Sequence, residues 1–128
     1  IILDTNFLLI PYQWKIDIFE EIGRICIFPY KLIVLDSTLK ELKIIQEKQK
    51  RKAKEAAKLG SDLAKKKATI IKTTENELVD KTILRITKPD THIVATQDIP
   101  LKKELKKKRI PIIQMRQKKY LIITNAHS

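Results

Sequence analysis

The chain has 128 residues, with 27 lysines and arginines against 15 aspartates and glutamates, a formal charge of +12 and a pI near 9.8. This length suits one domain, covering residues 1–128, with one hydrophobic core. The single cysteine, Cys26, excludes an internal disulfide or a cysteine-based zinc site, and its expected place is a buried one in a reducing compartment. No apolar run approaches the ~20 residues that cross a bilayer, so the sequence predicts a soluble, cytoplasmic protein without a membrane partner.

The positive charge points to a polyanionic partner, and nucleic acid is the commonest polyanion in cells. The alternative is a lysine-rich surface of the kind found in heat-adapted proteins, where charge covers solvated helix faces. Aromatic residues make up only 5% of the chain, so contacts to backbone phosphates are expected rather than base stacking. With two glycines there is no glycine-rich phosphate loop, which excludes a nucleotide triphosphatase.

Strand and helix patterns alternate in the first half of the chain. The predicted elements are, in order, a strand at 1–4, a helix at 15–23, a strand at 31–36, and a helical tract from Ser37 through the lysine-rich segment 46–68. Gly23 is expected to end the first helix. Gly60 and Ser61 either break the long tract into a helical hairpin or interrupt one long helix.

The alternation continues in the second half. The predicted elements are a strand at 69–73, a helix that ends at Ile86, a strand at 92–98, a helix at 99–108, a strand at 110–115 and an edge strand at 120–123. Thr74 and Glu77 have the spacing of a capping box at the start of the helix that ends at Ile86. Asp36 and Ser37 are placed to cap the helix that they precede.

This order predicts an α/β fold: three layers, α/β/α, around a central, mainly parallel sheet of about five strands. Ligands bind such sheets beyond the carboxyl ends of the strands. Asp4 and Asp98 both follow predicted strands, so the two carboxylates should meet at that edge. Each also has a structural interpretation: Asp98 as a helix N-cap, and Asp4 in an Asx turn with Thr5 and Asn6.

Two further acids lie on predicted helices. Glu41 shares a helix face with Ile45 and leans toward the packed side, where a solvated carboxylate would gain nothing. Asp80 lies away from the apolar stripe of its helix, so periodicity alone predicts a surface residue.

Five blocks of sequence resemble one known family. They are LDTNFLL at 3–9, LDSTLKEL at 35–42, LVDKTIL at 78–84, IVATQDIPLKKEL at 93–105 and IPIIQMRQKKYLII at 110–123. In this order they resemble a PIN domain, in particular the archaeal and eukaryotic PIN proteins of small-subunit ribosomal RNA processing. The resemblance covers nearly the whole chain and is weakest through the lysine-rich middle. It implies a metal-dependent nuclease with four carboxylates in its active centre.

The resemblance implies a role for each matching position. The catalytic and metal-binding carboxylates fall on Asp4, Glu41, Asp80 and Asp98, while Asn6, Ser37 and Thr96 match positions that orient those carboxylates or a bound water. One departure is Lys81, which stands where relatives frequently carry a second, adjacent acid. The lost charge would weaken a second metal position or alter specificity.

Four carboxylates in one cleft need a cation, because each close pair of like charges costs about 4 kcal/mol at an effective dielectric of 20. Oxygen ligands without cysteine point to one or two Mg²⁺ or Mn²⁺ ions. His92 and His127 are interpreted as bystanders. Such ions lower the pKa of water for in-line attack on phosphorus, which would leave a 5′-phosphate and a 3′-hydroxyl.

Basic residues are expected to hold the RNA backbone at the mouth of the cleft. The predicted RNA-binding residues are Lys102, Lys103, Lys106 and Arg109 after Asp98, and Arg116, Lys118 and Lys119 after the fifth strand. The lysines of the middle helices either bind RNA or form a solvated face with pairs such as Glu47 and Arg51.

The leading hypothesis is an endoribonuclease that acts on a ribosomal RNA precursor, with a pre-ribosomal protein as a further partner. One alternative is a toxin ribonuclease held silent by an antitoxin. Another is a catalytically weak RNA-binding assembly factor, which Lys81 would favour. Tyr12 and Trp14 either anchor the first helix or form a homodimer contact.

Overall fold

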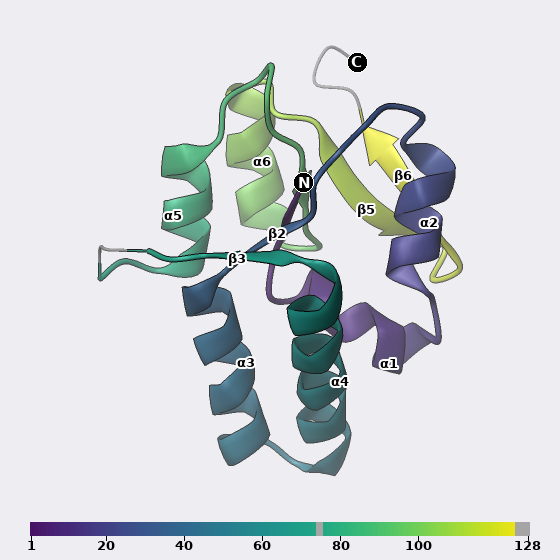
Figure 1. Cartoon of the computed structure of the whole chain (residues 1–128), viewed down its shortest axis with the longest axis vertical. Coiled ribbons are helices and arrows are strands. Elements are labelled where there is room, and N and C mark those ends of the chain that lie inside the picture. Colours follow the sequence, from purple (N-terminus) through teal and green to yellow (C-terminus); the bar gives the residue numbers. More distant parts are fainter. Residues whose placement is uncertain (74–75, 125–128) are drawn as a thin grey trace.

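A six-stranded sheet forms the centre of the molecule (Figure 1), in a computed structural model that describes residues 1–73 and 76–124. The strand order is β3-β2-β1-β4-β5-β6. The strands are β1 (Ile2–Leu3), β2 (Ile33–Leu35), β3 (Thr69–Ile71), β4 (Val94–Ala95), β5 (Ile112–Arg116) and β6 (Tyr120–Thr124). All neighbours are parallel except β5 and β6, which are antiparallel. The predicted edge strand at 120–123 is confirmed: β6 pairs with β5 and brings the sheet from about five strands to six.

Successive residues of the central strands enter two separate cores, because side chains alternate between the faces of a sheet. Ile2, Val94 and Ile112 pack on one face, in a core with α5 (Val79–Ile86) and α6 (Ile99–Lys107). Leu3 and Ala95 pack on the other face, in a core with the remaining helices. These are η1 (Phe7–Leu9), α1 (Ile10–Trp14), α2 (Ile18–Ile25), α3 (Asp36–Lys48) and α4 (Arg51–Lys67). The three-layer prediction is confirmed.

Helix α2 begins and ends later than the sequence predicted. Its N-cap is Asp17, whose carboxylate accepts hydrogen bonds from the backbone N–H groups of Phe19 and Glu20, both at 3.1 Å. The helix continues through Gly23 to Ile25, so the predicted stop at Gly23 is wrong. Cys26 follows the helix and is buried, as expected.

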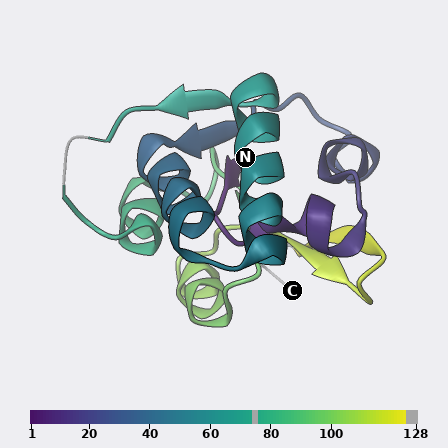
Figure 2. The same ribbon diagram turned by 90° about the horizontal axis from the view of Figure 1, so that it is seen from below.

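The lysine-rich tract folds as a hairpin of α3 and α4 that projects from the sheet (Figures 1 and 2). The break falls at residues 49–50 rather than at Gly60 and Ser61, which are both buried inside α4. Arg51 is the first residue of α4, and its Nε lies 3.6 Å from Glu55 Oε1 in the same helix. Glu47 belongs to α3, so Glu47 and Arg51 are not one turn apart on one helix as predicted. Asp36 is the first residue of α3 and Leu35 is its N-cap, so the predicted capping role of Asp36 and Ser37 is wrong.

Helix α5 begins at Val79, with Leu78 at the N-cap and no side-chain cap. The predicted capping box depends on Thr74, which lies outside the described residues. Glu77 forms an ion pair with Arg85 of α5, with 2.7 Å between Oε1 and Nε. Within the described ranges, no helix combines the length and apolarity needed to cross a lipid bilayer.

The two glycines offer a matched test of packing. A Cβ at Gly60 would overlap the backbone carbonyl of Leu8, whereas a Cβ at exposed Gly23 would meet only the Tyr30 hydroxyl at 3.7 Å. We expect Gly60→Ala to destabilise the fold by about 2–3 kcal/mol, because backbone must move. Gly23→Ala should stabilise it by about 0.5–1 kcal/mol, because alanine favours helix. Urea unfolding of both variants measures this, and equal shifts would contradict the tight contact between α4 and η1.

Candidate active site

The four predicted carboxylates line one cleft of about 350 Å³ at the carboxyl edge of the sheet. They come from four places in the chain: the end of β1, helix α3, the first turn of α5 and the N-cap of α6. The other lining residues are Thr5, Asn6, Leu9, Ile45, Leu78 and Val79. The fold thus brings together acids that are up to 94 residues apart in sequence, Asp4 and Asp98.

Asp4 is buried at the centre of this edge, with 5% of the residue exposed. The pairing of β1 with β4 places it there, because the Asp4 N–H donates to the Ala95 carbonyl at 2.9 Å. Its Oδ1 accepts a hydrogen bond from the N–H of Thr5, the next residue, at 2.8 Å. The predicted Asx turn would instead use the N–H two residues on, that of Asn6. Burial raises the pKa of the Asp4 carboxyl, its hydrogen bonds with Thr96 and Thr5 oppose that rise, and the nearby charges of Asp98 and Glu41 add to it.

Thr96 holds two of the acids, and Asn6 bonds to the segment that carries Thr96. The buried Thr96 hydroxyl donates to Asp4 Oδ2 at 2.6 Å and accepts from the Asp98 N–H at 3.1 Å. Asn6 Oδ1 accepts from the Gln97 N–H at 3.0 Å. The segments after β1 and β4 are therefore joined by side-chain hydrogen bonds in addition to the sheet.

Asp98 both caps a helix and lines the cleft. Its Oδ1 accepts from the Leu101 N–H at 2.9 Å, which confirms the N-cap prediction for α6. The carboxylate is half-buried and also forms part of the cleft wall. The structural and functional interpretations of this residue are compatible.

Glu41 is held by a residue that the sequence analysis did not assign to the site. The Thr5 hydroxyl donates to Glu41 Oε1 at 2.5 Å and so joins the end of β1 to α3. Glu41 and Ile45 both line the cleft, as their shared helix face predicted. The signal that could have identified Thr5 is its place between Asp4 and Asn6 in the first sequence block.

Asp80 lines the cleft, although helical periodicity placed it on the surface. Helix α5 begins only one residue earlier, so Asp80 lies in its first turn, at the end that faces the cleft. Its Oδ1 accepts from the Lys81 N–H at 2.9 Å. The Lys81 side chain is exposed and is not part of the lining.

Ser37 is not among the residues that line the cleft. Its hydroxyl is buried without a hydrogen-bond partner among the described residues. The neighbouring Asp36 instead carries the contacts: its Oδ1 accepts from the Ser37 N–H, the Thr73 N–H and the Thr73 hydroxyl. Asp36 thereby ties the start of α3 to the segment after β3, and these bonds lower the pKa of its carboxyl.

The predicted basic residues of α6 divide between the two edges of the sheet. Lys102 is half-buried and its Nζ donates to Gln114 Oε1 at 2.8 Å. Burial and the charge of Lys106 lower the pKa of Lys102, against the effect of Asp98. Lys103 lies beside it in the first turns of α6, whereas Arg109 follows the far end of the helix and lies at the amino edge. Arg109 is therefore not at the mouth of the cleft.

The second basic group lies at the end of β5, with Arg116, and in the turn to β6, with Lys118 and Lys119, at the carboxyl edge. Its members Arg116, Lys118 and Lys119 are exposed. The Lys118 ammonium lies 4.8 Å from the centre of the Trp14 ring, a cation–π contact on a side chain that is 39% exposed. Trp14 is thus at the surface, packed against a basic residue.

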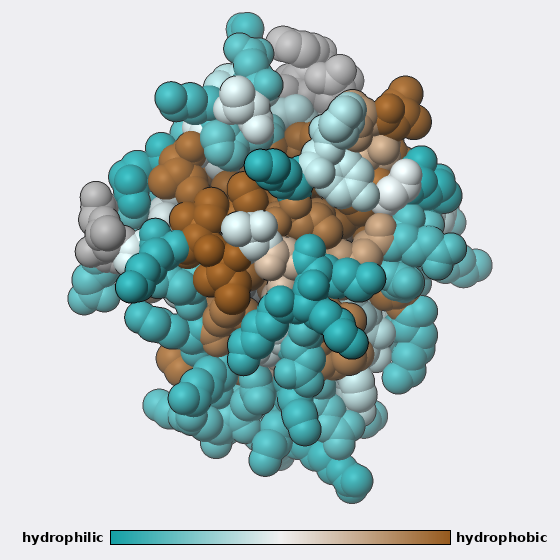
Figure 3. All heavy atoms as spheres, viewed as in Figure 1, coloured by the Kyte–Doolittle hydropathy of each residue, from teal (hydrophilic) through white to brown (hydrophobic). Residues whose placement is uncertain are grey.

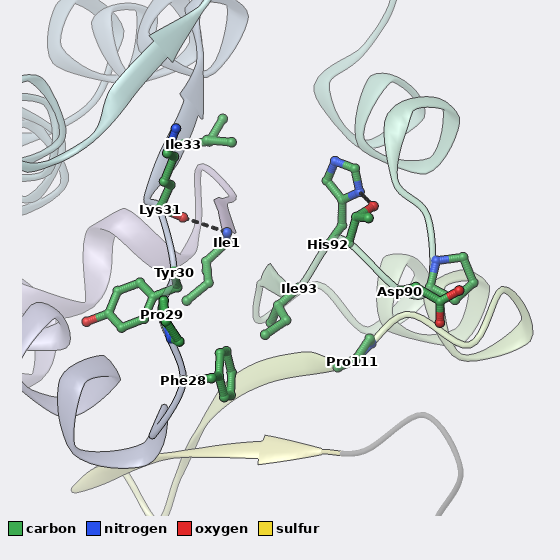
Figure 4. A pocket seen from close by; sticks show the side chains of 12 residues that line it. Ile1, Phe28, Pro29, Tyr30, Lys31, Ile33, Asp90, His92, Ile93 and Pro111 are labelled. Carbon is green, nitrogen blue, oxygen red and sulfur yellow. Dashed lines mark hydrogen bonds between the residues drawn. The ribbon is translucent and has the colours of Figure 1, made fainter.

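A larger cleft of about 680 Å³ lies at the opposite, amino edge of the sheet (Figure 4). Its wall is mainly apolar, with Phe28, Ile93 and Pro111 among its residues. His92 also lines it, and its Nδ1 accepts from the Lys88 N–H at 3.1 Å, which occupies that nitrogen in a turn. The prediction that His92 is a bystander agrees with this position, while His127 lies outside the described residues.

The acidic cleft has the donor chemistry for a hard divalent cation, since its ionisable groups are four carboxylates. In the side-chain positions of the described residues, no three acids, histidines or cysteines are gathered closely enough to hold a metal ion. Burial is the main cause of the raised pKa of Asp4, and the nearby charges of Asp98 and Glu41 add to it. The four carboxylates fit such an ion by the chemistry of their donor atoms.

A three-layer fold with an acidic cleft at the carboxyl edge is the arrangement expected of a PIN domain, and the chain belongs to the PIN-like domain family, whose sequence profile matches residues 1–118. A relative is the protein named Ribonuclease VapC4 of Methanocaldococcus jannaschii, 34% identical over 125 residues, or 96% of this chain and 95% of that one. The solved structure of the PIN domain endonuclease Utp24 has the same fold, with a TM-score of 0.77 and 24% identity over 97% of this chain and 90% of that chain.

Proposed function

We propose that the protein is a metal-dependent endoribonuclease that hydrolyses phosphodiester bonds in RNA. The observation that carries the proposal is the convergence of four carboxylates from four elements in one cleft of a chain with a net charge of +12. Membership of the PIN-like family and 34% identity to a protein named as a ribonuclease support it.

Asp4, Glu41, Asp80 and Asp98 would hold one or two Mg²⁺ or Mn²⁺ ions, which supply a lowered water pKa and positive charge at the scissile phosphate. The protein contributes carboxylate acceptors that four elements of the fold bring to one cleft. Thr96 holds the Asp4 carboxylate from one side at 2.6 Å, and Thr5 holds Glu41 at 2.5 Å. The proposed products carry a 5′-phosphate and a 3′-hydroxyl.

Basic residues near the cleft would hold the flanking phosphates by charge rather than by base recognition. Lys102 and Lys103 follow Asp98 on α6, and at the same edge Arg116 ends β5 while Lys118 and Lys119 lie in the turn after it. Lys81, in the first turn of α5, is exposed and follows Asp80 in the chain, and its ammonium would attract a phosphate where an acid would repel it.

The test is cleavage of single-stranded and hairpin RNAs in Mn²⁺, Mg²⁺ and EDTA. We expect internal cuts in one or both ions and none in EDTA, because the carboxylates need a cation to accept a phosphate. Product ends are checked by sensitivity to a 5′-phosphate-dependent exonuclease. RNA that stays intact in millimolar Mn²⁺, but is bound, would contradict the enzyme and favour an RNA-binding assembly factor.

The biological setting is a second part of the proposal: a cytoplasmic enzyme acting on a ribosomal RNA precursor, supported by the sequence blocks described above. The alternative is a toxin ribonuclease controlled by an antitoxin, and the ribonuclease relative is compatible with either setting. Purification from native cells separates them, because co-purification with pre-ribosomal particles supports the first and with one small inhibitory protein the second. Gel filtration tests the further proposal of a homodimer.

A further inference from the structure

A second polar cleft, of about 370 Å³, lies between α3 and α4. Four of its lining residues are lysines, Lys40, Lys43, Lys58 and Lys65, and its one acid is Asp62. We call this cleft the lysine groove. Figure 3 shows that hydrophilic residues cover this part of the molecule, where the hairpin projects.

The cations of the lysine groove are not fixed by any ion pair among the described residues, although the charge of Lys40 contributes to the lowered pKa of Asp36. Among residues 1–73 and 76–124, none of these four lysines forms an ion pair or donates a side-chain hydrogen bond. Lys107 by contrast pairs with Glu104 at 3.1 Å. Four ammonium groups around one hollow repel one another, and an external polyanion would relieve that repulsion.

The groove is formed by a packed pair of helices. Leu42 of α3 and Ala57 and Ala64 of α4 are fully buried in the same core. Gly60 brings α4 against the backbone of Leu8. The two helix backbones that carry the groove are therefore held by packing before a ligand binds, which lowers the cost of binding.

Helix α3 separates the lysine groove from the acidic cleft. Glu41 and Ile45 line the acidic cleft, whereas Lys43 lines the groove. At about 100° per residue, Glu41 and Lys43 project about 200° apart, across a helix about 10 Å wide. The exposed surface between them carries Lys40 and Ile44, which is 52% exposed.

We propose that the lysine groove binds the sugar–phosphate backbone of the RNA whose scissile linkage lies in the acidic cleft, with the strand crossing the exposed face of α3. This inference rests on the proposed function. The acidic cleft repels a polyanion, so cations next to it must hold the strand. On α6, Lys102 shares its ammonium with Gln114, and Arg109 lies at the other edge, so this helix alone offers few cations for the strand. The groove supplies cations one helix away.

The test measures binding of a fluorescent 20-nucleotide RNA in EDTA, where cleavage does not interfere. The groove variant is Lys43→Ala, Lys58→Ala and Lys65→Ala. The control is Lys52→Ala, Lys66→Ala and Lys67→Ala, which removes the same charge from the exposed side of α4 outside the groove. We expect the groove variant to bind about 10-fold more weakly or worse, and its salt slope to fall by about 2, since each lost phosphate contact removes about 0.7. The control should lose less than about 3-fold.

Equal losses in the two variants would overturn the inference, because charge alone would then explain binding. A 20-residue polyglutamate is the second probe. If the groove variant loses binding to polyglutamate but still binds RNA as tightly as wild type, the groove is a site for an acidic protein and the inference is overturned. Cleavage in Mn²⁺ is measured separately. If RNA binding depends on the groove lysines but no cleavage occurs, the proposed function is contradicted and RNA binding by the groove is supported. If RNA is cleaved but the groove variant binds it like wild type, only the inference about the groove is overturned.

Discussion

Asp98→Asn is expected to abolish RNA cleavage and leave the fold intact. Asparagine caps a helix about as well as aspartate, so the bond from the Leu101 N–H at 2.9 Å should persist. The variant loses the negative charge that one of the four cleft acids supplies. We expect cleavage to fall by at least about 10³-fold, the scale seen when a group that stabilises the transition state is removed, with stability changed by less than about 0.5 kcal/mol.

A matched control exists on another helix. Asp17 caps α2 through the same kind of bonds, is exposed, and is not among the residues that line the cleft. Asp17→Asn should therefore cleave RNA at the wild-type rate. Initial rates in Mn²⁺ and urea unfolding of both variants give the comparison. An Asp98→Asn protein that retains more than a tenth of wild-type activity would remove Asp98 from the catalytic centre.

The sequence identified the acids at the ends of strands and missed what depends on packing between helices. Asp4 and Asp98 follow β1 and β4, and parallel neighbours bring their carboxyl ends to one edge. Asp80 could not be placed by periodicity, because its position in the cleft depends on where α5 begins and how that helix lies on the sheet. The family resemblance placed it in the cleft where residue patterns alone did not.

Local sequence patterns also could not predict which side chains form hydrogen bonds with each other in the site. The bond from Thr5 to Glu41 joins residues 36 positions apart, and its existence depends on the path of α3 beside β1. The hairpin break at 49–50 was missed for a related reason. Glycine is the strongest local breaker, but Gly60 is needed inside α4 for close contact with Leu8. A packing requirement there outweighs the local preference.

Arg109 shows the limit of arguing from sequence proximity. It follows Asp98 by 11 positions, yet α6 runs from the carboxyl edge to the amino edge and carries it away from the cleft. Lys58, by contrast, belongs to the lysine-rich middle of the chain, for which the sequence left RNA contact open, and it lines the lysine groove. The distribution of cations around the site is thus set by the direction of each helix.

Asp4→Asn is expected to lose RNA cleavage to a similar extent and, in the absence of metal, to melt at a higher temperature than wild type. Burial raises the pKa of Asp4, so its charged form is more costly in the folded state than in the unfolded state. Asparagine removes that charge. Its amide can donate to the Thr96 oxygen, while the Thr96 hydroxyl turns to Asn6 Oδ1, 3.4 Å away.

The sign of the pH dependence follows from linkage. The folded protein holds the Asp4 proton to higher pH than the unfolded chain, in which an aspartate titrates near pH 3.9, about its reference value. Wild-type stability therefore falls as pH rises from about 4 through the raised pKa of the folded state, and the deficit persists at neutral pH. Asp4→Asn has no carboxyl that titrates at this position, so this loss of stability with rising pH is absent from the variant. We expect its melting temperature in EDTA to match wild type at pH 4 and to exceed it by about 3 °C or more at pH 7.

Mn²⁺ should reverse the difference in melting temperature between Asp4→Asn and wild type. An ion that binds only the folded protein stabilises it in proportion to RT ln(1 + [L]/Kd), and Asp4→Asn has one carboxylate fewer to bind with. Thermal melts from pH 4 to 8, in EDTA and in millimolar Mn²⁺, measure both effects, with Asp90→Asn at the amino edge as the control. If Asp4→Asn melts below wild type in EDTA at pH 7, Asp4 carries no burial cost. If Mn²⁺ stabilises both proteins equally, Asp4 is not a ligand.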